Sequence, residues 1–178
     1  MSFAAQFKGQ MGKAKMSGKG VYLPFGFQGR VKIKKFKPID GYQGKKSIVW
    51  EYELLESNLA DHPKGVTRSW TVVITGNDYA WGDLKAITFA LMGIDPDSVP
   101  DTSPLHDEAD ELFEEALGQC DKGEVPLFVG DEVLLETQKY TTKGDEKKNK
   151  PSRDVALYKW TPTDEAKAAR AEATAEAA

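Results

Sequence analysis

Two lysine-rich stretches of the sequence carry the residue types that bind phosphate groups and unpaired bases. Residues 139–153 hold six Lys or Arg against two Asp or Glu, and residues 34–46 hold five Lys against one Asp. Each stretch also carries a tyrosine, Tyr140 in one and Tyr42 in the other. Ammonium groups attract a phosphate backbone and release its counterions, and aromatic faces stack on unpaired bases. Together the stretches indicate a surface for single-stranded nucleic acid.

The candidate binding residues lie in and around these two stretches. The cations expected to contact phosphate are Arg30, Lys32, Lys34, Lys45, Lys46, Lys143, Lys147, Lys148, Lys150 and Arg153. The rings expected to stack on bases are Phe36, Tyr42, Tyr140, Tyr158 and Trp160. Two alternatives stay open: Arg30 and Lys32 can face Glu53 and Glu51 across the pair of first and second strands and form a neutral ladder, and residues 143–150 can be a solvated loop.

Period-two patterns predict the strands that would position these residues. Val31 and Ile33 alternate with basic residues, which indicates a half-buried strand. "SIVWEYELLES" and "VTRSWTVVITG" follow as second and third strands, and "LFVGDEVLLETQKYT" and "DVALYKW" as fourth and fifth. We expect Trp50, Tyr52 and Trp70 in the core, since large aromatic residues dominate cores. If Val155 and Leu157 are buried, Tyr158 and Trp160 face away from it.

Helical patterns fall between the third and fourth strands and at the end of the chain. "DYAWGDLKAITFALMG" has helical spacing and ends at Gly93, a good C-cap. In the next segment Ser103 can cap and Pro104 suits the first helical position. Its apolar stripe comprises Leu105, Ala109, Leu112, Phe113, Ala116 and Leu117. After Thr163, a possible cap, the Ala/Glu-rich end predicts a marginal helix.

The resulting order, β-β-β-α-α-β-β, predicts a mainly-β fold with helices, specifically a five-stranded OB-fold-like barrel. We expect a flexible basic arm over residues 1–20, an OB-fold domain over 21–162 with a helical insertion at 78–122, and a helical or disordered tail over 163–178. In an OB-fold, the loops between strands 1 and 2 and between strands 4 and 5 flank the ligand-binding face. Those loops coincide with the two lysine-rich stretches.

Charge is strongly segregated along the 178 residues, although the formal net charge is only −4. Residues 1–48 hold eleven Lys or Arg and one Asp, whereas residues 95–124 hold eleven Asp or Glu and one Lys. The acidic side chains of residues 103–118 are expected to form a solvated helix face. The alternative is a mimic of phosphate that competes with nucleic acid.

Composition favours a cytoplasmic binding protein over an enzyme. Cys120 is the single cysteine, so no intrachain disulfide can form. No apolar run reaches the ~18 residues that a membrane helix needs. His62 and His106 are distant in sequence, and no metal set, cofactor motif or nucleophile–base pattern stands out. We expect no catalytic residues, metal or cofactor.

The chain resembles the small OB-fold single-stranded-DNA-binding proteins encoded beside bacteriophage replication genes. The resemblance lies in "GVYLPFGFQGRVKI", "VWEYELLES", "LKAITFALMGID", "GDEVLLETQKYTTKGD" and "ALYKWTP", across residues 20–162. It implies non-specific protection of single strands during replication or recombination, in the host cytoplasm. Many such proteins end in an acidic, often aromatic tip that recruits replication partners. This chain instead ends in "AEATAEAA".

The expected partner is therefore single-stranded DNA, with RNA, self-association and replication proteins left open. A different class of function also fits the charge pattern. The basic arm and the acidic helix could make head-to-tail contacts between copies of a β-barrel interaction or virion module that binds no nucleic acid.

Overall fold

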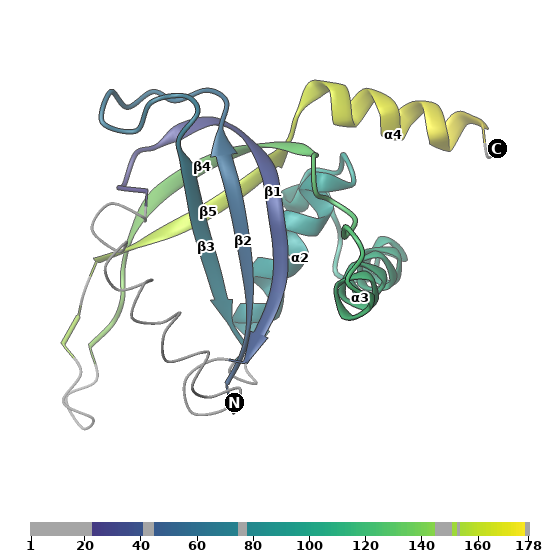
Figure 1. Ribbon diagram of the computed structural model, residues 1–178, viewed down its shortest axis with the longest axis horizontal. Coiled ribbons are helices and arrows are strands. Elements are labelled where there is room, and N and C mark those ends of the chain that lie inside the picture. Colours follow the sequence, from purple (N-terminus) through teal and green to yellow (C-terminus); the bar gives the residue numbers. More distant parts are fainter. Residues whose placement is uncertain (1–22, 41–44, 75–77, 145–150, 153, 177–178) are drawn as a thin grey trace.

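Five strands form one antiparallel sheet. The computed structural model describes residues 23–40, 45–74, 78–144, 151–152 and 154–176. The strands are β1 (Gln28–Asp40), β2 (Lys46–Leu54), β3 (Thr67–Val73), β4 (Glu132–Thr141) and β5 (Asp154–Pro162). Hydrogen bonds join them in the order β3-β2-β1-β4-β5 (Figure 1). The prediction of a mainly-β fold with five strands and helical segments between the third and fourth is confirmed. The expected arm, residues 1–20, lies outside the described residues.

The helices lie between β3 and β4 and after β5. They are α2 (Asp78–Leu91), the 3-10 helix η2 (Pro96–Ser98), α3 (Leu105–Lys122) and α4 (Asp164–Glu176). Figure 1 shows α2 behind the sheet, α3 beside it, and α4 extending away from it. α2 contacts β3, β4 and β5, while α3 contacts β1 and α2. Within the described residues, no helix combines the length and apolarity needed to span a bilayer.

The core is rich in aromatic residues, because alternate side chains of β2 and β3 point inward. On β2, the alternate residues Ile48, Trp50, Tyr52 and Leu54 are all buried. Trp70 on β3 is buried as well. The predicted core role of Trp50, Tyr52 and Trp70 is thus confirmed. Burying an aromatic side chain removes a large apolar area from water and stabilises the fold.

α3 covers part of this core with the predicted apolar stripe. Ala109, Phe113 and Ala116 are buried, and Leu112 and Leu117 pack against the core. The helix begins one residue later than predicted, because Pro104 is its N-cap. The Ser103 hydroxyl still accepts a hydrogen bond from the Leu105 N–H, at 3.3 Å, as a capping residue does.

Two predicted helix ends are confirmed. Gly93 follows α2 with φ of 78°, a left-handed conformation that favours glycine, and its N–H donates to the Ala90 carbonyl at 3.1 Å. A Cβ at Gly93 would also overlap the Ala166 carbonyl of α4. Thr163 caps α4, where its hydroxyl accepts from the Ala166 N–H at 3.2 Å.

The sheet is not closed into a barrel, yet its two edge strands touch through their side chains. The Trp70 ring of β3 stacks on the Tyr158 ring of β5, with 5.5 Å between centroids, and lies 5.2 Å from the Trp160 ring. Edge strands of a flat five-stranded sheet would lie about 19 Å apart, since neighbouring strands are about 4.8 Å apart. The sheet is therefore strongly curved.

A glycine on β1 permits one close approach in this curved sheet. A Cβ at Gly29 would overlap the carbonyl oxygen of Glu56. The neighbouring Arg30 carbonyl accepts hydrogen bonds from the N–H groups of Leu55 and Glu56, at 2.8 and 3.1 Å. The chain that leaves β2 is thereby held directly against the start of β1.

Candidate nucleic-acid interface

The two lysine-rich segments form hairpins whose stems are described and whose tips are not. β1 and β2 pair up to Asp40 and Lys46, and β4 and β5 pair up to Thr141 and Asp154. Figure 1 shows both hairpins extending toward the lower edge of the view. The predicted residues Tyr42, Lys147, Lys148, Lys150 and Arg153 lie outside the described residues.

The stem of the β1–β2 hairpin presents three exposed lysines. Lys37 lies on β1, Lys46 begins β2, and Lys45 directly precedes it. None of the three has an ion-pair partner among the described residues, which leaves their ammonium groups in contact with solvent. Such cations can meet a phosphate without first losing a protein partner.

The stem of the β4–β5 hairpin also presents an exposed lysine and an exposed ring near its tip. Lys143 is exposed and forms no ion pair within the described part of the chain, and the Tyr140 ring is 52% exposed. Lys139 instead binds the Asp154 carboxylate at 2.8 Å, and the Thr141 hydroxyl donates to the same carboxylate at 2.6 Å. The Lys139 bond is the main reason that the pKa of Asp154 lies below its usual range.

The cations on the strand face, by contrast, are neutralised by glutamates. Arg30 pairs with Glu56 at 2.8 Å and with Glu132 at 3.5 Å. Lys32 shares Glu132 at 3.8 Å. Lys34 pairs with Glu53 at 3.2 Å, and Lys35 with Glu51 at 3.9 Å. The alternative of a neutral ladder is therefore observed, although the partners of Arg30 and Lys32 differ from those expected.

This ladder of Arg30, Lys32, Lys34 and Lys35 changes what the face can bind. Ion pairs this exposed contribute only about 0–1 kcal/mol each to stability. Their electrostatic effect is still decisive, since a phosphate approaching Lys34 also meets the Glu53 carboxylate. Arg30, Lys32 and Lys34 therefore each have a carboxylate partner in this structure, and that they contact phosphate stays a prediction.

Two of the five predicted stacking rings are buried, so their placement on a binding surface is wrong. Phe36 is 2% exposed and packs on Trp50 and Phe113, with centroids 4.6 and 5.5 Å away. The register of β1 shifts between Ile33 and Lys35, which leaves Lys34 and Lys35 both exposed. A bulge of this kind changes which residues beyond it face inward.

Trp160 is also 2% exposed. In β5 the residues that face the core are those that were expected to face away from it. Leu157 is 45% exposed, whereas Trp160 and Pro162 are buried. The premise that Leu157 is buried was wrong, and with it the inference that Trp160 faces away from the core. Tyr158 is half-buried against Trp70. Among the described rings predicted to stack on bases, Tyr140 is the exposed one.

The acidic helix lies beside β1, and its carboxylates face outward. The Cys120 thiol of α3 donates to the Phe36 carbonyl of β1 at 3.4 Å. Within the described residues, the ion pairs of α3 go to α2 and α4: Asp110 binds Lys85 at 3.4 Å, and Glu108 binds Arg170 at 2.5 Å. No ion pair in this part of the chain joins an α3 carboxylate to a stem lysine.

Sequence reasoning missed two of the glutamates that pair with the strand-face cations, Glu56 and Glu132. Glu132 comes from β4, which pairs with β1 across about 100 residues of chain, and Glu56 follows β2. Glu132 stands in the predicted fourth strand and is the first residue of β4, but the register of that strand with β1 could not be read from sequence. Lys37 was counted in the basic segment without being singled out.

Within the described residues, no group of three or more His, Cys, Asp or Glu side chains could hold a metal ion. Comparison with protein-family models finds none that matches this chain. Comparison with curated proteins finds no match either.

Proposed function

We propose that the protein binds single-stranded nucleic acid, without catalysis, at the ends of its β1–β2 and β4–β5 hairpins. One observation carries the proposal: Lys37, Lys45, Lys46 and Lys143 have no ion-pair partner within the described residues, whereas the strand-face cations do. The binding surface we propose is narrower than the sequence suggested, and it excludes the ladder.

The order of the strands supports an OB-fold as the scaffold. An OB-fold is a partly open Greek-key barrel in which the loops joining strands 1 to 2 and 4 to 5 bind oligonucleotides. The order β3-β2-β1-β4-β5 is that of such a barrel opened between its third and fifth strands. The ring contact between Trp70 and Tyr158 lies at this opening.

The chemistry at the hairpin ends suits an unpaired strand. Ammonium groups contact the phosphates and displace counterions. The exposed Tyr140 ring offers a stacking platform, and stacking on a base is worth about 1–3 kcal/mol with little dependence on sequence. A protein with these groups would coat or protect single strands during DNA replication or recombination in the cytoplasm, which is the role that the resemblance implies.

The test is a titration of labelled oligo-dT with the full-length protein, followed by fluorescence anisotropy over a series of salt concentrations. If about five phosphates are neutralised, log affinity falls against log salt with a slope near −3.5. Parallel titrations with oligo-U and with duplex DNA measure the preference for DNA and for single strands. An affinity that is undetectable at low salt, or independent of salt, would contradict the proposal.

The second candidate is an interaction or structural module that binds no nucleic acid. It is favoured by the neutral ladder, whose glutamates pair with three of the cations that were expected to contact phosphate, Arg30, Lys32 and Lys34. Self-association of the protein without nucleic acid, combined with no binding of oligo-dT, would select this candidate.

A further inference from the structure

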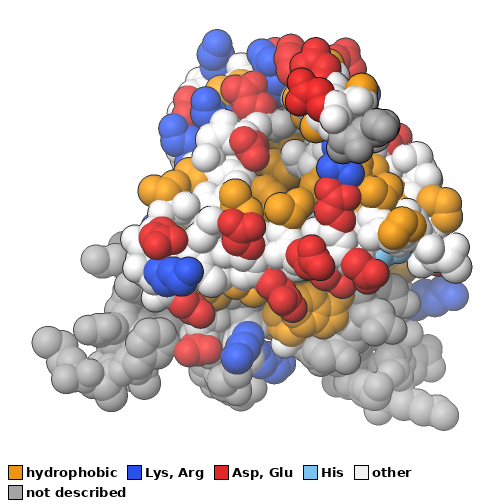
Figure 2. Space-filling view, turned by 90° about the vertical axis from the view of Figure 1, so that its right-hand side faces the viewer, with side chains coloured by type: hydrophobic (Ala, Val, Ile, Leu, Met, Phe, Trp, Pro, Cys, Tyr) orange, Lys and Arg blue, Asp and Glu red, His pale blue; other side chains and the backbone are white. Residues whose placement is uncertain are grey.

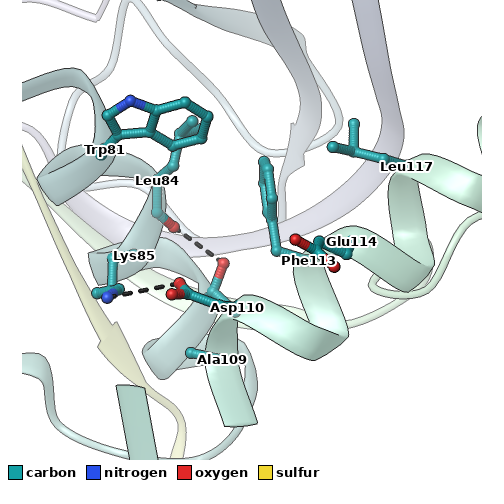
Figure 3. A pocket seen from close by; sticks show the side chains of 9 residues that line it. Trp81, Leu84, Lys85, Ala109, Asp110, Phe113, Glu114 and Leu117 are labelled. Carbon is teal, nitrogen blue, oxygen red and sulfur yellow. Dashed lines mark hydrogen bonds and ion pairs between the residues drawn. The ribbon is translucent and has the colours of Figure 1, made fainter. Parts of the chain in front are cut away.

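A hollow of about 320 Å³ lies between α2 and α3, on the side of the molecule away from the β4–β5 hairpin. It is lined by Trp81, Leu84, Lys85, Thr88, Ala109, Asp110, Phe113, Glu114 and Leu117. Figure 3 shows Trp81 of α2 and Phe113 of α3 on either side of it, with the Lys85–Asp110 ion pair at one end. The floor is therefore apolar and the rim is charged.

Trp81 is the most unusual residue of this hollow. It is 49% exposed, whereas Trp50, Trp70 and Trp160 are at most 8% exposed. An exposed indole beside an apolar hollow marks a surface that gains free energy when another chain covers it. Aromatic anchors of this kind are enriched at protein–protein contacts.

The rim of the hollow is acidic. Asp110 and Glu114 line it, and Asp107 and Glu111 are exposed on the same helix. In the described part of the chain, Asp110 alone among these four has an ion-pair partner. Figure 2 looks onto this side and shows acidic side chains spread across it, with apolar surface between them. A partner that combines apolar side chains with positive charge would fit.

The N-terminal segment of the same sequence has that composition. Residues 1–20 contain four lysines and no acidic residue. Phe3, Phe7 and Met11 are spaced four residues apart, and this spacing places side chains on one face of a helix. Lys8 and Lys15 add positive charge to the same segment. The apolar side chains of the segment would match the apolar floor of the hollow, and its lysines would match the acidic rim.

We propose that the hollow between α2 and α3 binds the N-terminal segment, residues 1–16, of a second copy of this protein. The described chain begins at Leu23, which lies next to β4: the Thr137 hydroxyl donates to the Pro24 carbonyl at 2.5 Å, and the Gly26 N–H donates to the Thr137 carbonyl at 2.7 Å. Figure 1 shows this start and α3 on opposite sides of the molecule.

This geometry favours contact between copies over contact within one copy. An arm that leaves from one side and a hollow on the other form a head-to-tail contact, which extends into a row of subunits when it does not close into a ring. Such a row would give cooperative binding along a single strand. The contact does not depend on nucleic-acid binding, because none of its residues is among those proposed to bind phosphate or bases.

The test is sedimentation velocity of the full-length protein without nucleic acid, over a range of protein and salt concentrations. The arm variant carries Phe3→Asp and Phe7→Asp and keeps an intact hollow. The hollow variant carries Trp81→Ser and Glu114→Lys, both at exposed positions, and keeps an intact arm. Asp61→Lys, an exposed carboxylate in the β2–β3 connection, is the charge control. Circular dichroism checks that each variant is folded.

We expect the wild type and Asp61→Lys to self-associate, more strongly at low salt, and each of the two variants to be monomeric. A mixture of the arm and hollow variants should form a 1:1 dimer, since it contains one intact arm and one intact hollow. Acrylamide quenching of the wild type should decrease as protein concentration rises, because Trp81 becomes covered.

Three results would overturn the proposal. A wild type that is monomeric at every concentration excludes the contact between copies. A mixture that stays monomeric although the wild type associates shows that the arm and the hollow do not bind each other across copies. Association that persists unchanged in both variants places the contact elsewhere on the protein.

Discussion

The strand face of β1 and the ends of the two hairpins are both rich in lysine, but among the described residues the lysines of the strand face are paired with carboxylates and those of the hairpin ends are not. On the strand face, Lys34 and Lys35 pair with Glu53 and Glu51. At the hairpin stems, Lys45, Lys46 and Lys143 have no such partner among the described residues. Local charge density in a sequence therefore does not measure the positive potential that a ligand meets. The acidic residues that the fold brings alongside decide it.

The two regions should also respond differently to mutation. A change that disturbs the packing beneath the ladder should reduce the stability of the whole domain. A change at the hairpin ends should reduce binding and leave the free energy of unfolding nearly unchanged, because exposed charges contribute little to it.

The largest expected effect comes from Gly29→Ala, at the start of the ladder. The added Cβ would overlap the Glu56 carbonyl oxygen, so the chain after β2 would have to move away from β1. We expect the free energy of unfolding to fall by about 3 kcal/mol, the upper part of the usual cost of overpacking. Urea denaturation measures it.

The matched control for this change is Gly118→Ala. Gly118 lies in α3, and nothing stands within 4 Å of a Cβ built there. Alanine should therefore stabilise the helix by about 0.5–1 kcal/mol. If the two variants changed stability equally, the close approach at Gly29 would not be a constraint.

A smaller effect is expected at the exposed ring of the β4–β5 hairpin. Tyr140→Ala removes a ring that is 52% exposed and should weaken oligo-dT binding by about fivefold, which corresponds to the lower end of the stacking energy of one base. Tyr140→Phe keeps the ring and should bind within about twofold of the wild type. An equal loss in both variants would mean that the hydroxyl group, rather than the ring, makes the contact.

The smallest effect concerns a paired carboxylate outside both regions. Glu108 accepts from the Arg170 guanidinium at 2.5 and 2.7 Å, and this hydrogen bonding lowers the pKa of Glu108. The folded state then binds its proton less readily than the unfolded chain. The pair therefore stabilises the protein fully at pH values above the ordinary carboxyl pKa. This contribution is lost as the pH falls through the lowered pKa of Glu108.

The measurement is urea denaturation of the wild type and Glu108→Gln at pH 7 and at pH 3. We expect the wild type to be more stable by less than about 1 kcal/mol at pH 7, since the pair is partly exposed, and the difference to be smaller at pH 3. Glu111→Gln, an exposed neighbour on α3, serves as the control. A difference of the same size at both pH values would show that charge is not its cause.

The parts of the fold that depend on local patterns could be predicted from the sequence. The inward set of β2, the apolar stripe of α3 and the left-handed C-cap at Gly93 are each set by residues within a few positions of one another. Hydrophobic periodicity and capping rules describe such short-range effects well.

The candidate site depended on long-range pairing, and there the sequence was a poor guide. The bulge in β1 turned Phe36 inward, and the contact of β5 with β3 covered Trp160. Glu132 reached Arg30 and Lys32 because β4 pairs with β1. A shift of one residue in a strand moves every side chain to the other face, so these placements required the tertiary structure.

The most direct measurement compares the salt dependence of oligo-dT binding for two double variants. Lys45→Ala/Lys46→Ala and Lys34→Ala/Lys35→Ala each remove two positive charges, the first pair at a hairpin stem and the second from the ladder. If the hairpin ends bind phosphate, the slope of log affinity against log salt should become shallower by about 1.4 in the first variant and stay unchanged in the second. Equal changes in both slopes, or a larger change in the ladder variant, would contradict binding at the hairpin ends.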